Sequence, residues 1–219
     1  MSINRNLWKS QFKTFPNWLC PHCQSGSLAL LKDSLKHAET SYSHAAKDAD
    51  GWEPEWIEER FSALLRCANT TCGEVVAVGG RTHHVEDHDW ERQEQHWARE
   101  FQPVFLSPAP AVFPIPEECP AAVANELRKA FGLIWADAGS CANRLRAAVE
   151  ALLTDRKVPR QRLGKKKKWV RMDLHARIEK FKEKDPEIAE YLLALKWLGN
   201  VGSHTNLDEL NVNDLLDGF

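Results

Sequence analysis

The first half of the chain contains two pairs of cysteines that indicate its fold: Cys20-Pro-His-Cys23 and Cys67-Ala-Asn-Thr-Thr-Cys72-Gly73. Two thiolates separated by two residues can bind one tetrahedral Zn²⁺ from one side, and a second pair completes a set of four ligands. The second spacing is longer, but Asn69 and Gly73 are residues that favour a turn. We therefore predict a structural zinc site whose ligands are Cys20, Cys23, Cys67 and Cys72.

Other interpretations of these cysteines remain open from the sequence. His22 lies between two of the predicted ligands and could replace one of them. The four cysteines could also be unrelated buried residues, or Cys20 and Cys23 could form a redox pair. Cys119 and Cys141 lie in the helical half of the chain, and we expect them to be packing residues.

The segments around the second cysteine pair predict short strands. Residues 61–67 and 74–78 are rich in strand-forming side chains, which with the cysteines indicates a small zinc ribbon within residues 1–100. Residues 37–50 are polar and are interpreted as an insertion or a weak helix. Residues 90–101 are interpreted as an amphipathic helix or an irregular segment. Four histidines could form a second metal site or an exposed polar surface: His83, His84, His88 and His96.

A proline-rich segment, residues 101–118, separates the two halves of the chain. Its five prolines exclude a helix and favour an extended chain. Its aliphatic and aromatic side chains predict a linker that packs against a domain surface.

The pattern after this segment, in residues 119–219, is helical. Apolar residues recur at helical spacing from about Pro120, in a second stripe that ends near Asp155, and in a third around Ile178. Asp185-Pro186 is a typical helix start, and a last short helix is expected at 208–216. No strand is expected here. The predicted fold class is therefore α+β, with a β-rich zinc ribbon followed by a helical bundle.

Composition and charge exclude several classes of protein. The chain has 219 residues, 43% of them hydrophobic and 27% charged, which excludes extensive disorder. It has no apolar run long enough to span a membrane and no signal peptide at its start, so no membrane partner and a cytoplasmic location are expected. The net charge of −2 is uneven, because residues 1–118 carry −6 and residues 119–219 carry +4.

Nine positive charges lie between residues 156 and 171, with no acidic residue among them. Dense positive charge favours phosphate contacts, and Trp169 could stack on a base. An exposed loop, or a surface for an acidic partner, is the alternative. The predicted nucleic-acid-binding residues are Arg156, Lys157, Arg160, Arg162, Lys165, Lys166, Lys167, Lys168, Trp169 and Arg171.

Asn200 and His204 are the candidate catalytic residues. They lie four positions apart near the end of an apolar helix, where a histidine can act as a general acid or base. Alternatively, both side chains cap the helix and form hydrogen bonds within the bundle.

The segments Pro114-Ile-Pro116, Asn143-Arg-Leu-Arg-Ala-Ala-Val-Glu150 and Leu198-Gly-Asn-Val-Gly-Ser-His204 resemble the domain of unknown function 4145 (DUF4145) family. The cysteine pairs resemble the zinc ribbon that often precedes this domain. The resemblance implies a HEPN-like helical fold, an association with bacterial or phage restriction and defence proteins, and a homodimer. Many HEPN proteins are metal-independent RNases with an Arg-polar-x-x-x-His motif.

The chain departs from this RNase motif at one position. Asn200 and His204 match the polar residue and the histidine, but Gly199 stands where the arginine is expected. Lys196, Arg144 or Arg146 could substitute for it. We therefore expect a non-catalytic, zinc-containing accessory protein that binds nucleic acid or a protein partner. The alternatives are an RNase that uses His204 and a pure protein-interaction adaptor.

Overall fold

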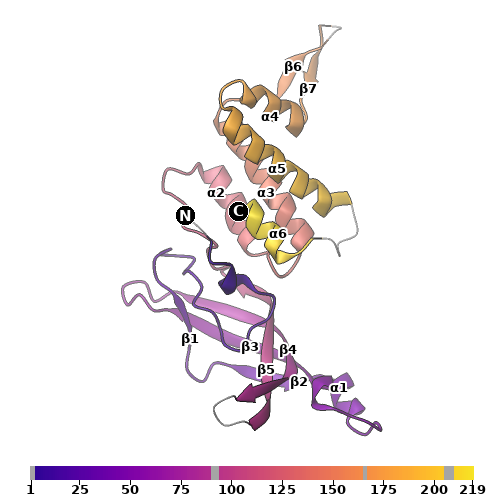
Figure 1. Ribbon diagram of the computed structural model, residues 1–219. Coiled ribbons are helices and arrows are strands. Elements are labelled where there is room, and N and C mark those ends of the chain that lie inside the picture. Colours follow the sequence, from indigo (N-terminus) through magenta and orange to yellow (C-terminus); the bar gives the residue numbers. More distant parts are fainter. Residues whose placement is uncertain (1–2, 90–93, 165–166, 205–209) are drawn as a thin grey trace. The chain divides into compact units, whose positions relative to one another are not determined.

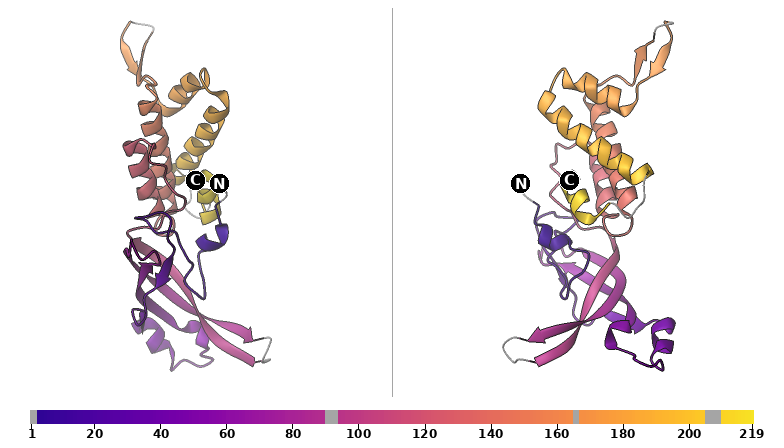
Figure 2. Two further views of the ribbon diagram at one scale, coloured as in Figure 1. Left: turned by 90° about the vertical axis from the view of Figure 1, so that its left-hand side faces the viewer. Right: turned by 45° about the vertical axis from the view of Figure 1, so that its right-hand side comes forward.

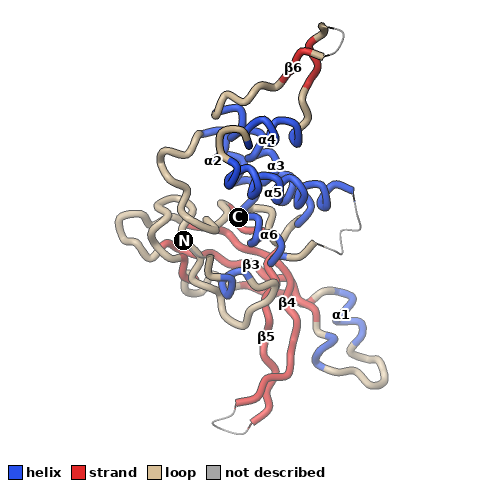
Figure 3. Tube along the Cα trace, turned by 45° about the horizontal axis from the view of Figure 1, so that its top comes forward, coloured by secondary structure: helices blue, strands red, loops and turns tan. Residues whose placement is uncertain are grey.

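The computed structural model describes residues 3–89, 94–164, 167–204 and 210–219. The chain divides into two compact units, Met1–Pro114 and Ile115–Phe219. Strands form the core of the first unit and helices form most of the second (Figure 3), as the sequence predicts. The boundary between the units lies within the proline-rich segment 101–118.

The N-terminal unit is built on one antiparallel sheet of five strands (Figure 1). Its strand order is β1-β3-β4-β5, and β2 also pairs with β3. The elements are η1 (Arg5–Trp8), β1 (Leu28–Leu30), β2 (Lys36–Glu39), α1 (Ser41–Ala46), η2 (Pro54–Trp56), β3 (Glu58–Cys67), β4 (Val75–Asp89) and β5 (Glu94–Ser107).

Strand β3 explains how the sheet acquires a buried face. Its residues alternate between buried and exposed from Glu59 to Cys67, because successive side chains of a strand point to opposite faces. Phe61, Ala63 and Leu65 thereby enter the core. The same alternation places Cys67 on the buried face at the end of the strand.

An aromatic cluster covers this face of the sheet. The rings of Phe12 and Phe15, from the N-terminal segment, lie 5.4 Å from Trp18 and 5.9 Å from Phe61, respectively. Trp18 is fully buried and donates its indole N–H to the carbonyl oxygen of Leu7 at 2.6 Å. This packing fixes the chain immediately before Cys20.

Strands β4 and β5 form a long twisted hairpin (Figure 2). The predicted amphipathic helix or irregular segment at 90–101 is therefore wrong for residues 94–101, which belong to β5. Trp97 and Phe101 are four residues apart, and that spacing puts two side chains on one face in a strand as well as in a helix. Pairing with β4, where Thr82 lies opposite Phe101, decides between the two.

The proline-rich segment begins inside the sheet. Its first seven residues, 101–107, form the end of β5, and Pro103 pairs with Gly80 of β4. Further along, Ala111 is buried and donates its backbone N–H to the carbonyl oxygen of Leu19 at 3.2 Å.

A buried carboxylate links three strands of the sheet. Glu59 of β3 is 6% exposed and accepts hydrogen bonds from Nε of Arg99 at 2.7 Å and from the hydroxyl of Thr82 at 2.9 Å. Burial raises the pKa of Glu59, but these two donors outweigh it and hold the pKa at about 2.

Glu59→Gln is expected to lower the free energy of unfolding by about 2 kcal/mol at neutral pH. The folded pKa of Glu59 lies below its ordinary value of 4.5, so its contribution is complete above that value and is lost as the pH falls towards 2. Urea unfolding at several pH values should therefore show the two proteins converging in acid. The control is Glu58→Gln, which removes an exposed ion pair of 3.8 Å with Arg60 and should change little. A difference independent of pH would contradict the prediction.

In its described residues, the C-terminal unit contains five helices and one small hairpin (Figure 1). Its elements are α2 (Ala121–Phe131), α3 (Ala138–Asp155), β6 (Gln161–Leu163), β7 (Trp169–Arg171), α4 (Leu174–Lys182), α5 (Pro186–His204) and α6 (Val212–Gly218).

The predicted apolar stripes meet around α3. Val149 and Leu153 of α3 pack with Ile178 of α4 and with Ala189 and Leu192 of α5. Carboxylates cap the helices, since Asp137 accepts from the backbone N–H of Ser140 at 2.8 Å and Asp185 accepts from that of Ile188 at 3.0 Å.

Gly139-Ser140 lies in the first turn of α3, which Asp137 caps. One sequence-based expectation for this unit is wrong. The expected absence of strands is contradicted by β6 and β7, which pair in antiparallel register within the basic segment. The last helix spans Val212–Gly218, and the beginning of its expected range, 208–209, lies outside the described residues.

Candidate metal centre and basic hairpin

Two turns hold the four cysteines. In the first, Cys20 donates its backbone N–H to the carbonyl oxygen of Gly26 at 2.8 Å and accepts from the N–H of Gln24 at 3.0 Å. In the second, Cys72 lies between β3 and β4 and donates its N–H to the carbonyl oxygen of Asn69 at 3.0 Å. Gly73 follows with a φ of 63°, a conformation that favours glycine.

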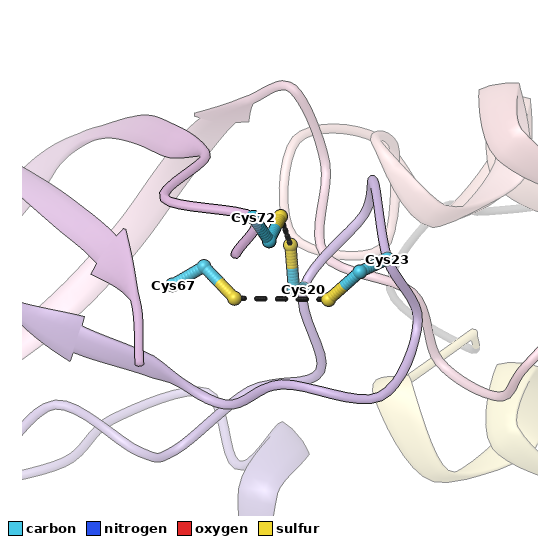
Figure 4. Close-up of side chains that lie close together, drawn as sticks. All are labelled: Cys20, Cys23, Cys67 and Cys72. Carbon is cyan, nitrogen blue, oxygen red and sulfur yellow. Dashed lines mark hydrogen bonds between the residues drawn. The ribbon is translucent and has the colours of Figure 1, made fainter. Parts of the chain in front are cut away.

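The four sulfur atoms point towards one another (Figure 4) and all lie within 4.8 Å of one another. Sγ of Cys20 is 3.8 Å from that of Cys72, and Sγ of Cys23 is 3.7 Å from that of Cys67. A tetrahedron of thiolates about 2.3 Å from a central ion has edges of about 3.8 Å. A disulfide would require about 2.05 Å, and all four cysteines are free. The predicted ligands therefore form one cluster that is compatible with a metal ion.

The surroundings of the four sulfur atoms restrict which residues fit beside them. A Cβ atom at Gly26 would lie 2.5 Å from Sγ of Cys67, so only glycine fits beside this sulfur. The backbone N–H of Gly26 also points to Sγ of Cys23 at 3.3 Å. Nδ1 of His22 lies 3.5 Å from Sγ of Cys72, which makes this histidine a hydrogen-bonding neighbour of the four-sulfur cluster.

The thiols differ in their acidity. Burial raises the pKa of Cys67 to about 12 and also raises that of Cys20. Hydrogen bonds from the Ser25 side chain and from the backbone amides of Ser25 and Gly26 lower the pKa of Cys23 to about 5. A metal cation bound between the four sulfur atoms would stabilise all four cysteines as thiolates.

The histidines of the sheet do not join a second cluster. His83, His84 and His96 lie within β4 and β5, and Nε2 of His84 is 3.4 Å from the carboxylate of Glu59. Among the described residues, the four cysteines are the one group of three or more potential ligands that could hold a metal.

The basic segment forms the hairpin of β6 and β7, which leads away from the helices of its unit (Figure 1). Leu163 pairs with Trp169, and both side chains are exposed, Trp169 at 69%. Lys167 and Lys168 are exposed beside Trp169, whereas Lys165 and Lys166 lie outside the described residues.

The other predicted basic residues fall in two places. Arg156 and Lys157 directly follow α3, and Lys157 has a φ of 57°. Arg160 and Arg171 stand at the base of the hairpin, where they line a cavity of about 620 Å³. Arg146 and Arg177 line the same cavity and were not among the predicted binding residues. Arg177 follows Leu174 by three positions and precedes Ile178 and Phe181, so its place on the apolar face of α4 was a signal in the sequence.

The candidate catalytic pair lies at the end of α5. Asn200 is half-buried, and the side chain of His204 lies outside what the structure describes. The three candidate substitutes for the missing arginine have other partners. Arg144 pairs with Glu126 at 3.2 Å, Arg146 approaches Glu150 at 4.0 Å, and Nζ of Lys196 lies 4.0 Å from the Trp197 ring.

Gly199 is the point where α5 crosses α3. A Cβ atom there would lie 2.8 Å from Cβ of Arg146 and 3.2 Å from the carbonyl oxygen of Ala142. Glycine at this position therefore allows the two helices to approach closely.

The protein therefore combines a four-cysteine cluster in its β-sheet unit with a basic hairpin in its helical unit. Residues 128–219 match the family model described as Domain of unknown function (DUF4145), which confirms the family resemblance for that segment. Residues 9–110, which contain the four clustered cysteines, match a second model described as Domain of unknown function (DUF8608). No curated protein and no solved structure matches the chain. Within the described residues, no helix is long and apolar enough to cross a membrane.

Proposed function

We propose that this protein is a zinc-containing, non-catalytic accessory protein that binds nucleic acid through the β6–β7 hairpin. The observation that carries the proposal is a hairpin that exposes Trp169 together with the basic side chains of Lys167, Lys168 and Arg162. Positive charge attracts the phosphate backbone, and an exposed aromatic ring can stack on an unpaired base.

The proposed metal is zinc, held by Cys20, Cys23, Cys67 and Cys72 in a zinc-ribbon-like site. Soft thiolate ligands in a tetrahedral arrangement favour zinc over calcium or magnesium, which prefer oxygen ligands. Four protein ligands leave no open position for a water molecule, so the ion has a structural role. It would join the turn before β1 to the turn between β3 and β4.

The helical unit is proposed to be HEPN-like but not to be an RNase. A catalytic arginine at the position of Gly199 is missing, and Arg146 directs its guanidinium to Glu150 on its own helix. The resemblance to proteins of restriction and defence makes such a system the proposed context. The alternative of a protein-interaction adaptor differs in its partner, which would then be an acidic protein.

The proposal is tested by the affinity of the full chain for fluorescent single-stranded RNA and DNA at several salt concentrations. Lys167→Gln/Lys168→Gln should weaken binding and reduce the slope of log K against log salt by up to about 0.7 for each charge. Trp169→Ala should weaken binding about tenfold without changing that slope, because stacking releases no counterions.

Lys32→Gln/Lys36→Gln is the matched control, since both lysines are exposed in the N-terminal unit and the charge change is the same. Absence of binding at low salt would exclude the proposal and leave the adaptor. RNA cleavage that persists in EDTA and is lost in His204→Ala would establish the RNase instead.

A further inference from the structure

An arginine-lined cavity lies in the C-terminal unit at the base of the hairpin. Its volume is about 620 Å³, and its charged lining residues are Arg146, Glu150, Arg160, Arg171, Asp173 and Arg177. This volume is in the range of pockets for small ligands. No residue of α5 is among the described residues that line it.

The inner wall of the cavity contains a buried, hydrogen-bonded arginine. Arg177 is 4% exposed, and its Nη2 donates to the hydroxyl oxygen of Thr154 at 3.0 Å and to the carbonyl oxygen of Val158 at 3.3 Å. Nη2 of Arg160 reaches the same Thr154 oxygen at 3.1 Å. Two guanidinium groups therefore converge on one neutral hydroxyl, with no carboxylate between them in the described part of the chain.

The two acidic residues of the lining do not balance the four arginines. Asp173 caps α4, where its carboxylate accepts from the backbone N–H of Ala176 at 2.8 Å. Glu150 lies 4.0 Å from Arg146, and of the described residues no other acid pairs with any of the four arginines. Four guanidinium groups and two carboxylates leave the lining with a net charge of +2.

Arg177 and Arg160 both reach the hydroxyl of Thr154, so their like charges repel each other. Burial lowers the pKa of the Arg177 guanidinium and the nearby charge of Arg160 lowers it further, whereas the carboxylate of Glu150 raises it. Nε of Arg177 and Nε of Arg146 are buried and have no acceptor among the described residues. A ligand with two negative charges would relieve this repulsion and neutralise the lining.

We propose that this arginine pocket binds the dianionic phosphate of a phosphate monoester. Such a group carries a charge of about −1.5 to −2 at neutral pH, which matches the lining, and its oxygens suit the forked donors of arginine. A phosphodiester carries one charge and matches less well. The source is a terminal phosphate of a nucleic acid strand or a free nucleotide. Of these two, only the terminal phosphate of a nucleic acid strand rests on the proposed function.

The first experiment titrates the full chain with inorganic phosphate at constant ionic strength, using isothermal calorimetry and chloride as the reference anion. The variant Arg160→Gln/Arg171→Gln removes two exposed guanidinium groups, and it should weaken phosphate binding at least about tenfold. Lys32→Gln/Lys36→Gln is the matched control, because it also removes two exposed positive charges and neither lysine lines the cavity, and it should bind phosphate like the wild type. Arg177→Lys, which keeps the charge but loses the fork, should also weaken binding.

Absence of phosphate binding by the wild type, or equal binding by Arg160→Gln/Arg171→Gln, would overturn the proposal. Oligonucleotide binding that depends on Trp169 would still support the proposed function in that case. The sources are separated by comparing an oligonucleotide with a 5′-phosphate, the same strand with a 5′-hydroxyl, and AMP. Tighter binding of the phosphorylated strand identifies a nucleic acid end. Equal binding of the two strands, with phosphate displaced by AMP, identifies a free nucleotide.

Discussion

Cys67→Ser should lose the bound metal and with it the stability of the N-terminal unit. Purified wild-type protein should contain about one zinc ion per chain, and this variant close to none. Cys67 is the last buried residue of β3, so its sulfur would connect the sheet core to a bound ion. The apparent free energy of metal binding in small structural zinc sites is about 10 to 16 kcal/mol at neutral pH, and loss of one of four ligands removes a large part of it.

Metal content by mass spectrometry and thermal unfolding by circular dichroism measure the two effects. Cys119→Ser is the matched control, because it makes the same chemical change in the other unit, outside the four-sulfur cluster. A chelator should destabilise the wild type and leave Cys67→Ser unchanged. Wild-type protein that contains no metal and is insensitive to the chelator would show that the cluster has another role.

The cysteine cluster could be predicted because its signal is local. Each pair of ligands lies on one turn, and the residues between them, such as Asn69, are those that a turn needs. The strand-forming side chains of residues 61–67 predicted a strand for the same reason. The range of β5 could not be predicted, because the spacing of Trp97 and Phe101 fits a strand and a helix equally. Its pairing with β4 is a long-range interaction that the segment itself does not encode.

Long-range interactions also limited what could be predicted for the helical unit. Its apolar stripes repeat within one helix and were visible, whereas the arginine pocket combines Arg146, Arg160, Arg171 and Arg177 from different elements. The basic run drew attention to Arg160 and Arg171 by composition alone. Nothing near Arg146 in the sequence connects it to them. Its place in the pocket follows from the tertiary arrangement of α3 and the hairpin.

The close approach of α3 and α5 also explains the departure from the RNase motif. The position where the motif has arginine is occupied by Gly199, and Arg146 fills the space in front of it. A side chain cannot be added at Gly199 unless Arg146 or the helix itself moves. The contact is with Cβ of Arg146, which is tied to its backbone, so rotation of that side chain does not relieve it.

Gly199→Arg should therefore destabilise the helical unit by about 3 kcal/mol, the upper part of the range for overpacked cores, and should not produce RNase activity. Val201→Arg is the matched control, since it adds the same charge to α5 at an exposed position, and it should change the stability by less than about 0.5 kcal/mol. Urea unfolding followed by circular dichroism measures the difference, and RNA incubated with each variant in EDTA reports cleavage. A Gly199→Arg protein as stable as the control would contradict the packing argument. EDTA-resistant cleavage by this variant would show that the missing arginine alone separates the chain from an RNase.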